Sequence, residues 1–377
     1  MTPLATLIAE LDQTEPAGPF LLRYRFRTPR HGAGAGARGV HSKDFIMVYA
    51  NALKRLLDRF LQPPHSRPFP WPKVDVYVVD VPDTLERAPF MAATKDGTPY
   101  VVLPCRIPEP DATAERLFAE ACAYHEGSHV LCQALRPYAH LESTAWRWFN
   151  EATAVWSELL LSPGNPSTFA CFVPWCDHPE CSLGQEPYWY GAGLFAHYLE
   201  THHERFSRPG FVSRVWTEGM ADGTPIDAIL RLSENPGTFH EYAVESYFTR
   251  VGERSTVFAA ALGRFGPRAL SISSPVGAGQ SIPIAGSVAG LATRFYRFYP
   301  DAGVQALELI PSVLPAGVRA GLATSSGDLA RLDSGPAPGA LQVRLAPPAP
   351  DHMVLVVSND STGTTAPAPF SCSVTAR

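Results

Sequence analysis

The segment ACAYHEGSHVLCQAL, residues 121–135, carries two histidines four residues apart, His125 and His129, with Glu126 beside the first. This spacing predicts a helix on which both imidazoles share one face, because side chains four apart have Cβ atoms about 5–6 Å from each other. Two such imidazoles can bind one metal ion. The same short pattern also arises by chance, and a buried histidine pair satisfied by hydrogen bonds is the alternative interpretation.

A third ligand is available on the next predicted helix, WRWFNEATAVWSELLL, residues 146–161. Glu151 follows His129 by 22 residues, which leaves room for one loop and a return onto the first helix. Its helical face also carries tryptophan and valine, so a carboxylate buried there needs a positive partner. We therefore predict that His125, His129 and Glu151 hold one catalytic zinc ion and leave a fourth position for water.

The two motifs together resemble the gluzincin metallopeptidases, the clan of thermolysin and the aminopeptidase-N-like enzymes. HEGSH corresponds to the H-E-x-x-H helix of that clan and WFNEATA to its N-E-x-x-A helix. PYWYGAGLFAHYL, residues 187–199, is similar to the Y-x-x-G segment of the aminopeptidase-N-like group, which implies that Tyr188 hydrogen-bonds the oxyanion. The similarity covers about residues 40–265. The layout looks closer to bacterial gluzincin-like peptidases with an appended sandwich than to the aminopeptidase-N-like group, and it implies a zinc-dependent peptidase.

One motif of the aminopeptidase-N-like group is missing from this sequence. That group carries a G-x-M-E-N strand whose glutamate binds the free amino terminus of a substrate. The strand GTPYVVLP, residues 97–104, occupies a comparable place upstream of the metal helix but contains no glutamate. Aminopeptidase specificity therefore does not follow from the resemblance.

Further roles are expected around the metal. Glu126 is expected to take a proton from water and pass it to the departing amine as general base and then acid. Glu158 is expected to accept the second N–H of a metal-bound imidazole, that of His129, and to fix its tautomer. Asn150, next to the predicted ligand, is the other candidate to support the ligands. The alternatives are a solvated carboxylate at Glu126, local pairing at Glu158 and plain core packing at Tyr188.

Two runs rich in β-branched and aromatic residues, KVDVYVVD at 73–80 and GTPYVVLP at 97–104, predict strands. An extended peptide substrate is expected to add as a further strand along Tyr100, Val101 and Val102, so that main-chain hydrogen bonds supply affinity.

A glycine-rich loop follows the predicted strand at residues 19–28. Gly34, Gly36 and Gly39 match the spacing of a dinucleotide-binding fingerprint. However, the strand alternates arginine with apolar residues, and the acidic Asp80 comes 41 positions after Gly39 rather than about 20. A flexible loop is the favoured interpretation, and a nucleotide-binding enzyme is a minor alternative.

The chain is expected to be α+β, with a zincin-like catalytic domain of mixed sheet and active-site helices followed by a C-terminal all-β sandwich. Helices are predicted over about 44–61, 112–135, 144–161 and 188–206. Beyond residue 268, short apolar runs alternate with Gly, Pro, Ser and Asp, which is typical of a sandwich. The expected divisions are 1–40 for an N-terminal strand and loop, 41–267 for the catalytic domain and 268–377 for the sandwich.

The charge and hydropathy of the sequence argue against some classes of binding partner. A net charge of −5 without a basic cluster argues against nucleic acid. The sequence has no apolar run of the length that a membrane span needs. The N-terminus does not read as a signal peptide, which suggests a cytoplasmic protein, or a secreted or periplasmic one if the true start lies upstream. The sandwich is a candidate to bind a protein or a glycan.

The remaining histidines and cysteines are expected to have structural rather than catalytic roles. His197, His202, His203 and His240 are expected to be helix-surface or core residues rather than ligands. Three cysteines lie close together in CFVPWCDHPEC, residues 171–181, where a local disulfide, free thiols and a second metal site with His178 are the options in descending order.

The leading functional hypothesis is a zinc metallopeptidase acting on peptides or proteins. Two alternative functions are compatible with the same site. A binding protein on a peptidase scaffold would retain a structural metal without catalysis, and a zinc hydrolase could use the same water chemistry on a non-peptide amide or ester.

Overall fold

The computed structural model describes residues 3–26, 39–63, 65, 69–80, 89–105, 107, 111–201, 210–219, 223–250, 270–324, 329–332, 339–345, 351–361 and 366–377. The chain divides into two units. Unit 1 contains Met1–Ala170 and Ser207–Thr217, and unit 2 contains Cys171–Phe206 and Glu218–Arg377. In the described part of the chain, no helix has the length and apolar character to cross a membrane.

Unit 1 is built on a five-stranded sheet in the order β1-β2-β3-β5-β4. Its strands are β1 (Gln13–Ala17), β2 (Phe20–Tyr24), β3 (Val74–Val79), β4 (Phe90–Ala93) and β5 (Pro99–Pro104). The three central strands β2, β3 and β5 run parallel, and β1 and β4 are added antiparallel at the edges. The strands predicted at 73–80 and 97–104 are therefore the central and penultimate strands of one mixed sheet.

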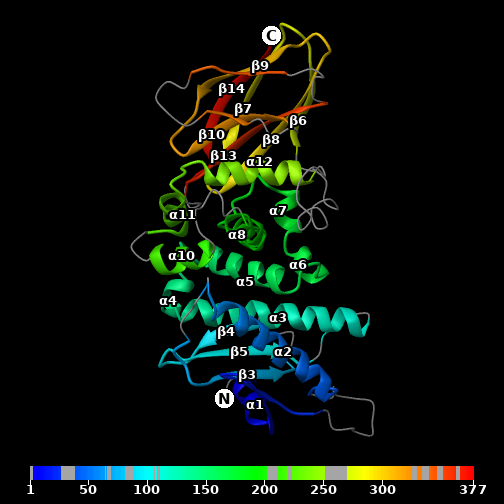
Figure 1. Ribbon diagram of the computed structural model, residues 1–377, viewed down its shortest axis with the longest axis vertical. Helices are drawn as coiled ribbons and strands as arrows, with labels where there is room; N and C mark the ends of the chain where they lie inside the picture. Colours follow the sequence, from blue (N-terminus) through cyan, green and yellow to red (C-terminus); the bar gives the residue numbers. More distant parts are fainter. Residues whose placement is uncertain are drawn as a thin grey trace. The chain divides into compact units, whose positions relative to one another are not determined.

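Helices cover both faces of this sheet. Helix α2 (Lys43–Phe60) links the parallel strands β2 and β3, and the Ser42 side chain caps it by accepting the Phe45 N–H. Its buried face packs on the sheet together with α3 (Ala112–Gln133), whereas α1 (Pro3–Ala9) lies on the opposite side (Figure 1). The strand predicted at residues 19–28 and the helix predicted at 44–61 are confirmed by β2 and α2, and residues 27–38 of the glycine-rich segment lie outside the described residues.

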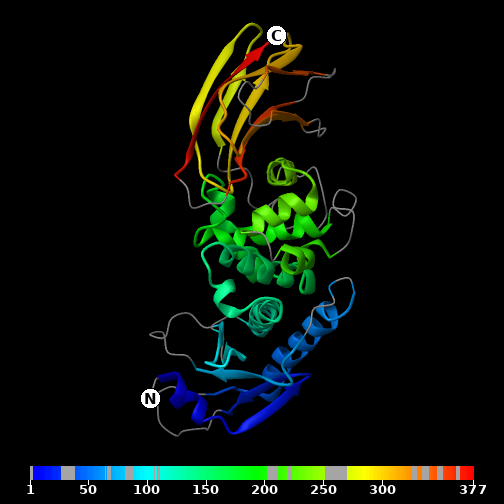
Figure 2. The ribbon, with the colours of Figure 1, turned by 90° about the vertical axis from the view of Figure 1, so that its left-hand side faces the viewer.

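The metal motifs lie on two neighbouring helices, α3 and α5 (Arg147–Leu161), with α3 between the sheet and α5 (Figures 1 and 2). Asp111 caps α3 by accepting the N–H groups of Thr113 and Ala114. Helix α5 begins later than predicted, because residues 143–146 form turns after α4 (Tyr138–Leu141). Helices α6 (Pro166–Ala170) and α10 (Phe211–Glu218) complete the helical layers.

The glycine in the middle of α3 is explained by close packing. A Cβ at Gly127 would lie 2.5 Å from Leu56 Cδ2 and 3.0 Å from Leu53 Cδ2, both on α2 and fully buried. On α3, Gly127 lies opposite to the histidines, because two helical residues correspond to a rotation of about 200°. The glycine thus lets α3 approach α2 while its other face turns to α5.

We expect Gly127→Val to lower the free energy of unfolding by about 1–3 kcal/mol, because the added methyl groups must displace buried leucines. Urea denaturation followed by tryptophan fluorescence measures this. Gly303→Val is the matched control, since a Cβ there meets nothing within 4 Å. Equal effects of the two substitutions would contradict the packing argument.

Unit 2 combines short helices with two sheets. Its helices are α7 (Val173–Asp177), the 3-10 turn η1 (Tyr188–Gly191), α8 (Ala192–Thr201), α11 (Pro225–Ser233) and α12 (Thr238–Arg250). One sheet has the order β11-β10-β13-β8-β6 and the other β12-β9-β14-β7. The strands are β6 (Leu270–Val276), β7 (Ser281–Val288), β8 (Ala292–Pro300), β9 (Ala306–Val313), β10 (Val318–Thr324), β11 (Leu329–Leu332), β12 (Leu341–Arg344), β13 (Met353–Asn359) and β14 (Ala368–Ala376).

The two C-terminal sheets share one hydrophobic core, as in a β-sandwich. Ile284 and Leu309 from one sheet join Tyr296, Leu322 and Leu355 from the other. Helix α12 packs on the opposite face of the five-stranded sheet. The helices of residues 171–201 and 223–250 therefore group with the C-terminal strands, whereas the sequence placed them with the catalytic domain. The expected boundary at 268 lies outside the described residues.

Candidate metal centre

Three ligand groups of the sequence prediction come together in unit 1. One donor atom each from His125, His129 and Glu151 lies within 4.8 Å of the other two. Oε2 of Glu151 is 3.2 Å from Nε2 of His125 and 3.7 Å from Nε2 of His129. The imidazole rings lie 4.8 Å apart between centroids and nearly perpendicular, at 83°. The spacing of four on α3 thus brings the two imidazoles together, as the sequence predicts.

These groups fit a metal ion by distance and by chemistry. Ligand atoms about 2.0–2.1 Å from one tetrahedral ion lie about 3.3 Å from one another, close to the two separations on Glu151. The nitrogen and oxygen donors suit several divalent metals, zinc among them. The carboxyl groups of Glu126 and Glu158 are also buried beside the cluster, and a cation there would stabilise their ionised forms. The residues present could therefore hold a metal ion.

Glu158 supports a different imidazole from the one predicted. Its Oε1 lies 2.7 Å from Nδ1 of His125, not of His129, and its Oε2 accepts a 2.7 Å hydrogen bond from the Thr168 hydroxyl. The reason is the antiparallel return of α5 along α3, which carries residue 158 toward the N-terminal end of α3. Asn150 lies beside His129 instead, where its side chain acts to raise the pKa of that imidazole against the larger effect of burial.

The two imidazoles have opposite electrostatic environments. Burial lowers the pKa of His129 to about 4, although the charge of Glu151 opposes this. Burial would also lower the pKa of His125, but its hydrogen bonds with Glu151 and Glu158 raise that pKa well above the usual range. Burial would raise the pKa of Glu151, yet the two histidines hold it below its ordinary value. His129 is thus neutral near pH 7, with a nitrogen lone pair available for a metal. In contrast, the two carboxylates favour the protonated, positively charged form of His125.

Glu126 is a buried carboxyl, which rules out the alternative of a solvated surface group. Only 4% of the residue is exposed. Burial raises the pKa of Glu126 to about 8, against the charge of His125, and a hydrogen bond from the backbone of Met91 on β4 also lowers this pKa. A carboxyl with a pKa near neutrality is suited to proton transfer.

We expect Glu158→Gln to weaken metal binding by about 10- to 100-fold, because partners that orient metal-ligating imidazoles have effects of this size. Competition with a fluorescent chelator measures the affinity. Thr168→Val is a milder companion, since it removes only the hydroxyl that holds Glu158. Unchanged affinity in Glu158→Gln would contradict a role for the 2.7 Å contact with His125.

Tyr188 lies in unit 2, on the 3-10 turn η1, and is partly buried. Its hydroxyl hydrogen-bonds Cys181, which raises the pKa of this tyrosine, and its ring lies 6.4 Å from that of His178. Its oxyanion role therefore stays a prediction.

Unit 1 contains three residues of this neighbourhood that sequence reasoning missed, Tyr138, Glu142 and Arg147. Burial raises the pKa of Tyr138, and the charges of Glu142 and Glu126 add to this shift. Arg147 lies four residues before Glu151, a spacing that was visible in the sequence.

The predicted substrate strand is wrong. Tyr100, Val101 and Val102 belong to β5, which pairs with β3 on one side and with β4 on the other. Its main-chain groups are therefore already used within the sheet. In the described part of the chain, β4 pairs on one side only, with β5, and Met91 places it next to Glu126. Residues 90–93 carry no pattern that would have revealed this short strand.

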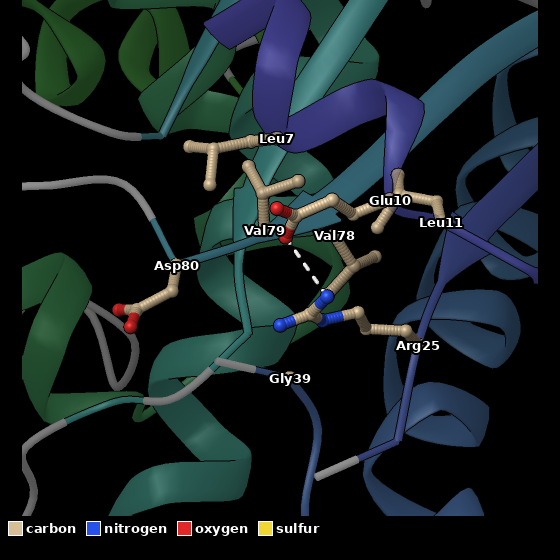
Figure 3. Close-up of a pocket in the computed structure, with 8 residues that line it drawn as sticks. All are labelled: Leu7, Glu10, Leu11, Arg25, Gly39, Val78, Val79 and Asp80. Atoms are coloured by element: carbon tan, nitrogen blue, oxygen red, sulfur yellow. Dashed lines mark ion pairs between the residues drawn. The ribbon is translucent and has the colours of Figure 1, made fainter. Parts of the chain in front are cut away.

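A small pocket lies at the carboxyl ends of β2 and β3, where a nucleotide would bind if the glycine loop had that function (Figure 3). Gly39 lines it, while Gly34 and Gly36 lie outside the described residues. The lining includes the carboxylates of Glu10 and Asp80, and Arg25 forms a 2.8 Å ion pair with Glu10. Two carboxylates against one paired arginine do not favour a diphosphate.

The remaining candidates do not join a cluster of possible ligands among the described residues. None of the seven cysteines forms a disulfide, so the local disulfide is absent, and the described residues contain no metal group that includes His178. His197 and His240 are buried, and His240 contacts the Ser358 hydroxyl at 2.8 Å. His202 and His203 lie outside the described residues.

Comparison with known proteins adds little. No family model and no curated protein matches the chain. PliG of Aeromonas hydrophila, a periplasmic inhibitor of g-type lysozyme, matches 28% of this chain and 100% of its own, with 15% identity and a TM-score of 0.22. The pre-peptidase C-terminal domain of a Bacillus anthracis collagenase matches 29% of this chain and 96% of its own, with 14% identity and a TM-score of 0.20. TM-scores this low carry no argument about fold or function.

Proposed function

We propose that this protein is a zinc-dependent metallopeptidase with a zincin-like catalytic domain in unit 1. The observation that carries the proposal is the buried carboxyl of Glu126 next to two imidazoles that converge with Glu151. A structural site needs no such additional carboxyl. A zinc ion held by His125, His129 and Glu151 would lower the pKa of a bound water to about 7 and polarise a substrate carbonyl.

The chain's own residues supply the proton transfers and the orientation of the ligands. The Glu126 carboxylate accepts a proton from the attacking water and donates it to the departing amine. Its pKa of about 8 in the absence of an ion matches a group that exchanges protons near neutrality. Glu158 holds His125 with its Nδ1 protonated, so that Nε2 is directed at the ligand cluster.

The edge strand β4 is the element on which an extended substrate is proposed to bind. A peptide added to the outer edge of Phe90–Ala93 would form main-chain hydrogen bonds there. Because Met91 contacts Glu126, such a peptide would pass beside the general base.

Two tyrosines compete for the oxyanion role. Tyr188 is implied by the resemblance to the aminopeptidase-N-like group, and Tyr138 is the tyrosine of unit 1 whose pKa responds to Glu126. Removing the hydroxyl that stabilises the oxyanion is expected to lower kcat about 100- to 1000-fold with little change in KM. Steady-state kinetics of Tyr188→Phe and Tyr138→Phe identify which one acts, and a full rate in both variants would leave neither with the role.

The proposal is tested by metal analysis joined to a cleavage assay. Purified protein is expected to contain one zinc ion per chain and to cleave members of a peptide library, with activity lost on chelation and restored by zinc. Zinc without cleavage of any peptide would favour the binding protein, and cleavage of esters or non-peptide amides alone would favour the other hydrolase. Full activity after complete removal of the metal would refute the proposal.

A further inference from the structure

The first turn of α5 carries a charged side chain on the same stripe as the ligand. Arg147 precedes Glu151 by four residues and Glu158 by eleven, and at about 100° per residue these three lie within roughly 40° of one another around the helix. The Arg147 side chain is 45% exposed, whereas that of Glu151 is 13% exposed. Arg147 thus lies at the rim of the site, and the ligand lies at its base.

The charge of Arg147 reaches the buried cluster. Burial has the largest influence on the pKa values of His129, Glu151, Tyr138 and Glu142, and the positive charge of Arg147 acts to lower all four. These four groups come from α3, α5, α4 and the residue after α4. The guanidinium therefore lies near the ligands His129 and Glu151 and near the segment that joins α4 to α5.

The contact of Arg147 with Glu142 is loose. Arg147 Nε and Glu142 Oε2 are 3.9 Å apart, and both side chains are more than one third exposed. Charge-assisted hydrogen bonds measure about 2.7–2.9 Å, and exposed ion pairs contribute about 0–1 kcal/mol. The pair with Glu142 is therefore weak, and an incoming carboxylate can compete with Glu142 for the guanidinium.

Arg136 and Arg147 differ in burial, and this difference distinguishes an arginine that packs in the interior from one that can bind a ligand. Arg136 is 2% exposed and stacks on Trp146, with Cζ 3.6 Å from the ring centroid, so its role is packing. Arg147 has no such burial. A guanidinium fork matches a carboxylate in bidentate geometry, a recognition that lysine does not reproduce.

We infer that Arg147 is a specificity-determining residue that binds a substrate carboxylate, so that the preferred substrates are peptides with a negative charge close to the scissile bond. This inference rests on the proposed peptidase function. The carboxylate can be the free carboxyl terminus or an aspartate or glutamate side chain, and both present the same chemistry to the guanidinium.

Matched short peptides distinguish these sources. One pair differs only in a carboxyl-terminal acid against an amide, and a second pair only in aspartate against asparagine near the cleaved bond. Wild-type protein is expected to favour the charged member of at least one pair in kcat/KM. Arg147→Ala is expected to lose about 10- to 100-fold on that member and to cleave the neutral one nearly as before, because a hydrogen bond to a charged group has this magnitude. Arg147→Lys should recover only part of the loss.

Two further variants sharpen the test. Glu142→Gln removes the competing carboxylate and is expected to lower KM for the charged peptide. Arg116→Ala is the matched control, since this arginine of α3 is 53% exposed and pairs with Glu120 at 3.2 Å. It is expected to leave the preference unchanged, and all variants should retain one metal ion per chain.

A binding measurement keeps this inference separate from the proposed reaction. Calorimetric titration of the Glu126→Gln protein with the same peptides is expected to show tighter binding of the charged member, and Arg147→Ala in that background should abolish the difference. Equal treatment of charged and neutral peptides by protein with intact Arg147 would overturn the inference while leaving peptide hydrolysis in place. Loss of hydrolysis on every peptide, with the charge preference retained in binding, would instead refute the proposed function alone.

Discussion

Replacing Glu126 with glutamine is expected to lower peptide hydrolysis at least about 100-fold and to leave the bound metal in place. Glutamine has nearly the same shape and can still accept the hydrogen bond from the Met91 backbone, but it cannot take a proton from water. Rates on a sensitive fluorogenic peptide and metal content by elemental analysis measure the two effects.

The same substitution is expected to lower activity without lowering the stability of the metal-free protein. The pKa of Glu126 is about 8 in the folded metal-free protein and about 4.5 when unfolded, so the folded state binds more protons between these values and stability falls as pH rises through them. Glutamine removes this dependence. Metal-free Glu126→Gln protein is therefore expected to be at least as stable as wild type at pH 8 in urea denaturation. A fully active variant would remove Glu126 from the mechanism, whereas a variant less stable than wild type at pH 8 would contradict the destabilising effect of the buried carboxylate.

Replacing Glu151 with alanine is expected to have the largest effect on metal affinity. Removing one of three protein ligands should weaken binding by more than the roughly 10- to 100-fold typical of groups that only orient a ligand. His125 also loses its 3.2 Å partner. Chelator competition measures the affinity, and circular dichroism establishes that the helices persist.

Glu151→Gln is the companion variant that keeps the side-chain volume. It retains one neutral oxygen donor and is expected to fall between wild type and alanine. Metal content equal to that of wild type in Glu151→Ala would show that another group supplies the third ligand.

The gathering of His125, His129 and Glu151 was predictable because it depends on local geometry. His125 and His129 share a face because residues four apart on a helix always do. Asp111 is a strong capping residue that fixes where the helix begins. The return of Glu151 needed only a loop of the right length. Strands such as Val74–Val79 were equally visible because β-branched residues dominate them.

The errors concern long-range pairing. No local pattern tells which neighbour β5 will have, and the four-residue strand β4 turned a proposed free edge into an interior strand. The partner of Glu158 depended on how α5 returns along α3, which determines whether residue 158 meets His125 or His129. Likewise, α12 packs on a sheet whose strands begin 20 residues later, a contact that no periodicity within the helix reveals.

X-ray absorption spectroscopy of the zinc-loaded protein tests the gathering of His125, His129 and Glu151 around one ion most directly. The account predicts two imidazole nitrogens at about 2.0–2.1 Å and oxygen donors at about 2.0–2.2 Å, with the signal lost in Glu151→Ala. Sulfur at about 2.3 Å would instead place the ion on cysteine thiolates and contradict the site described above.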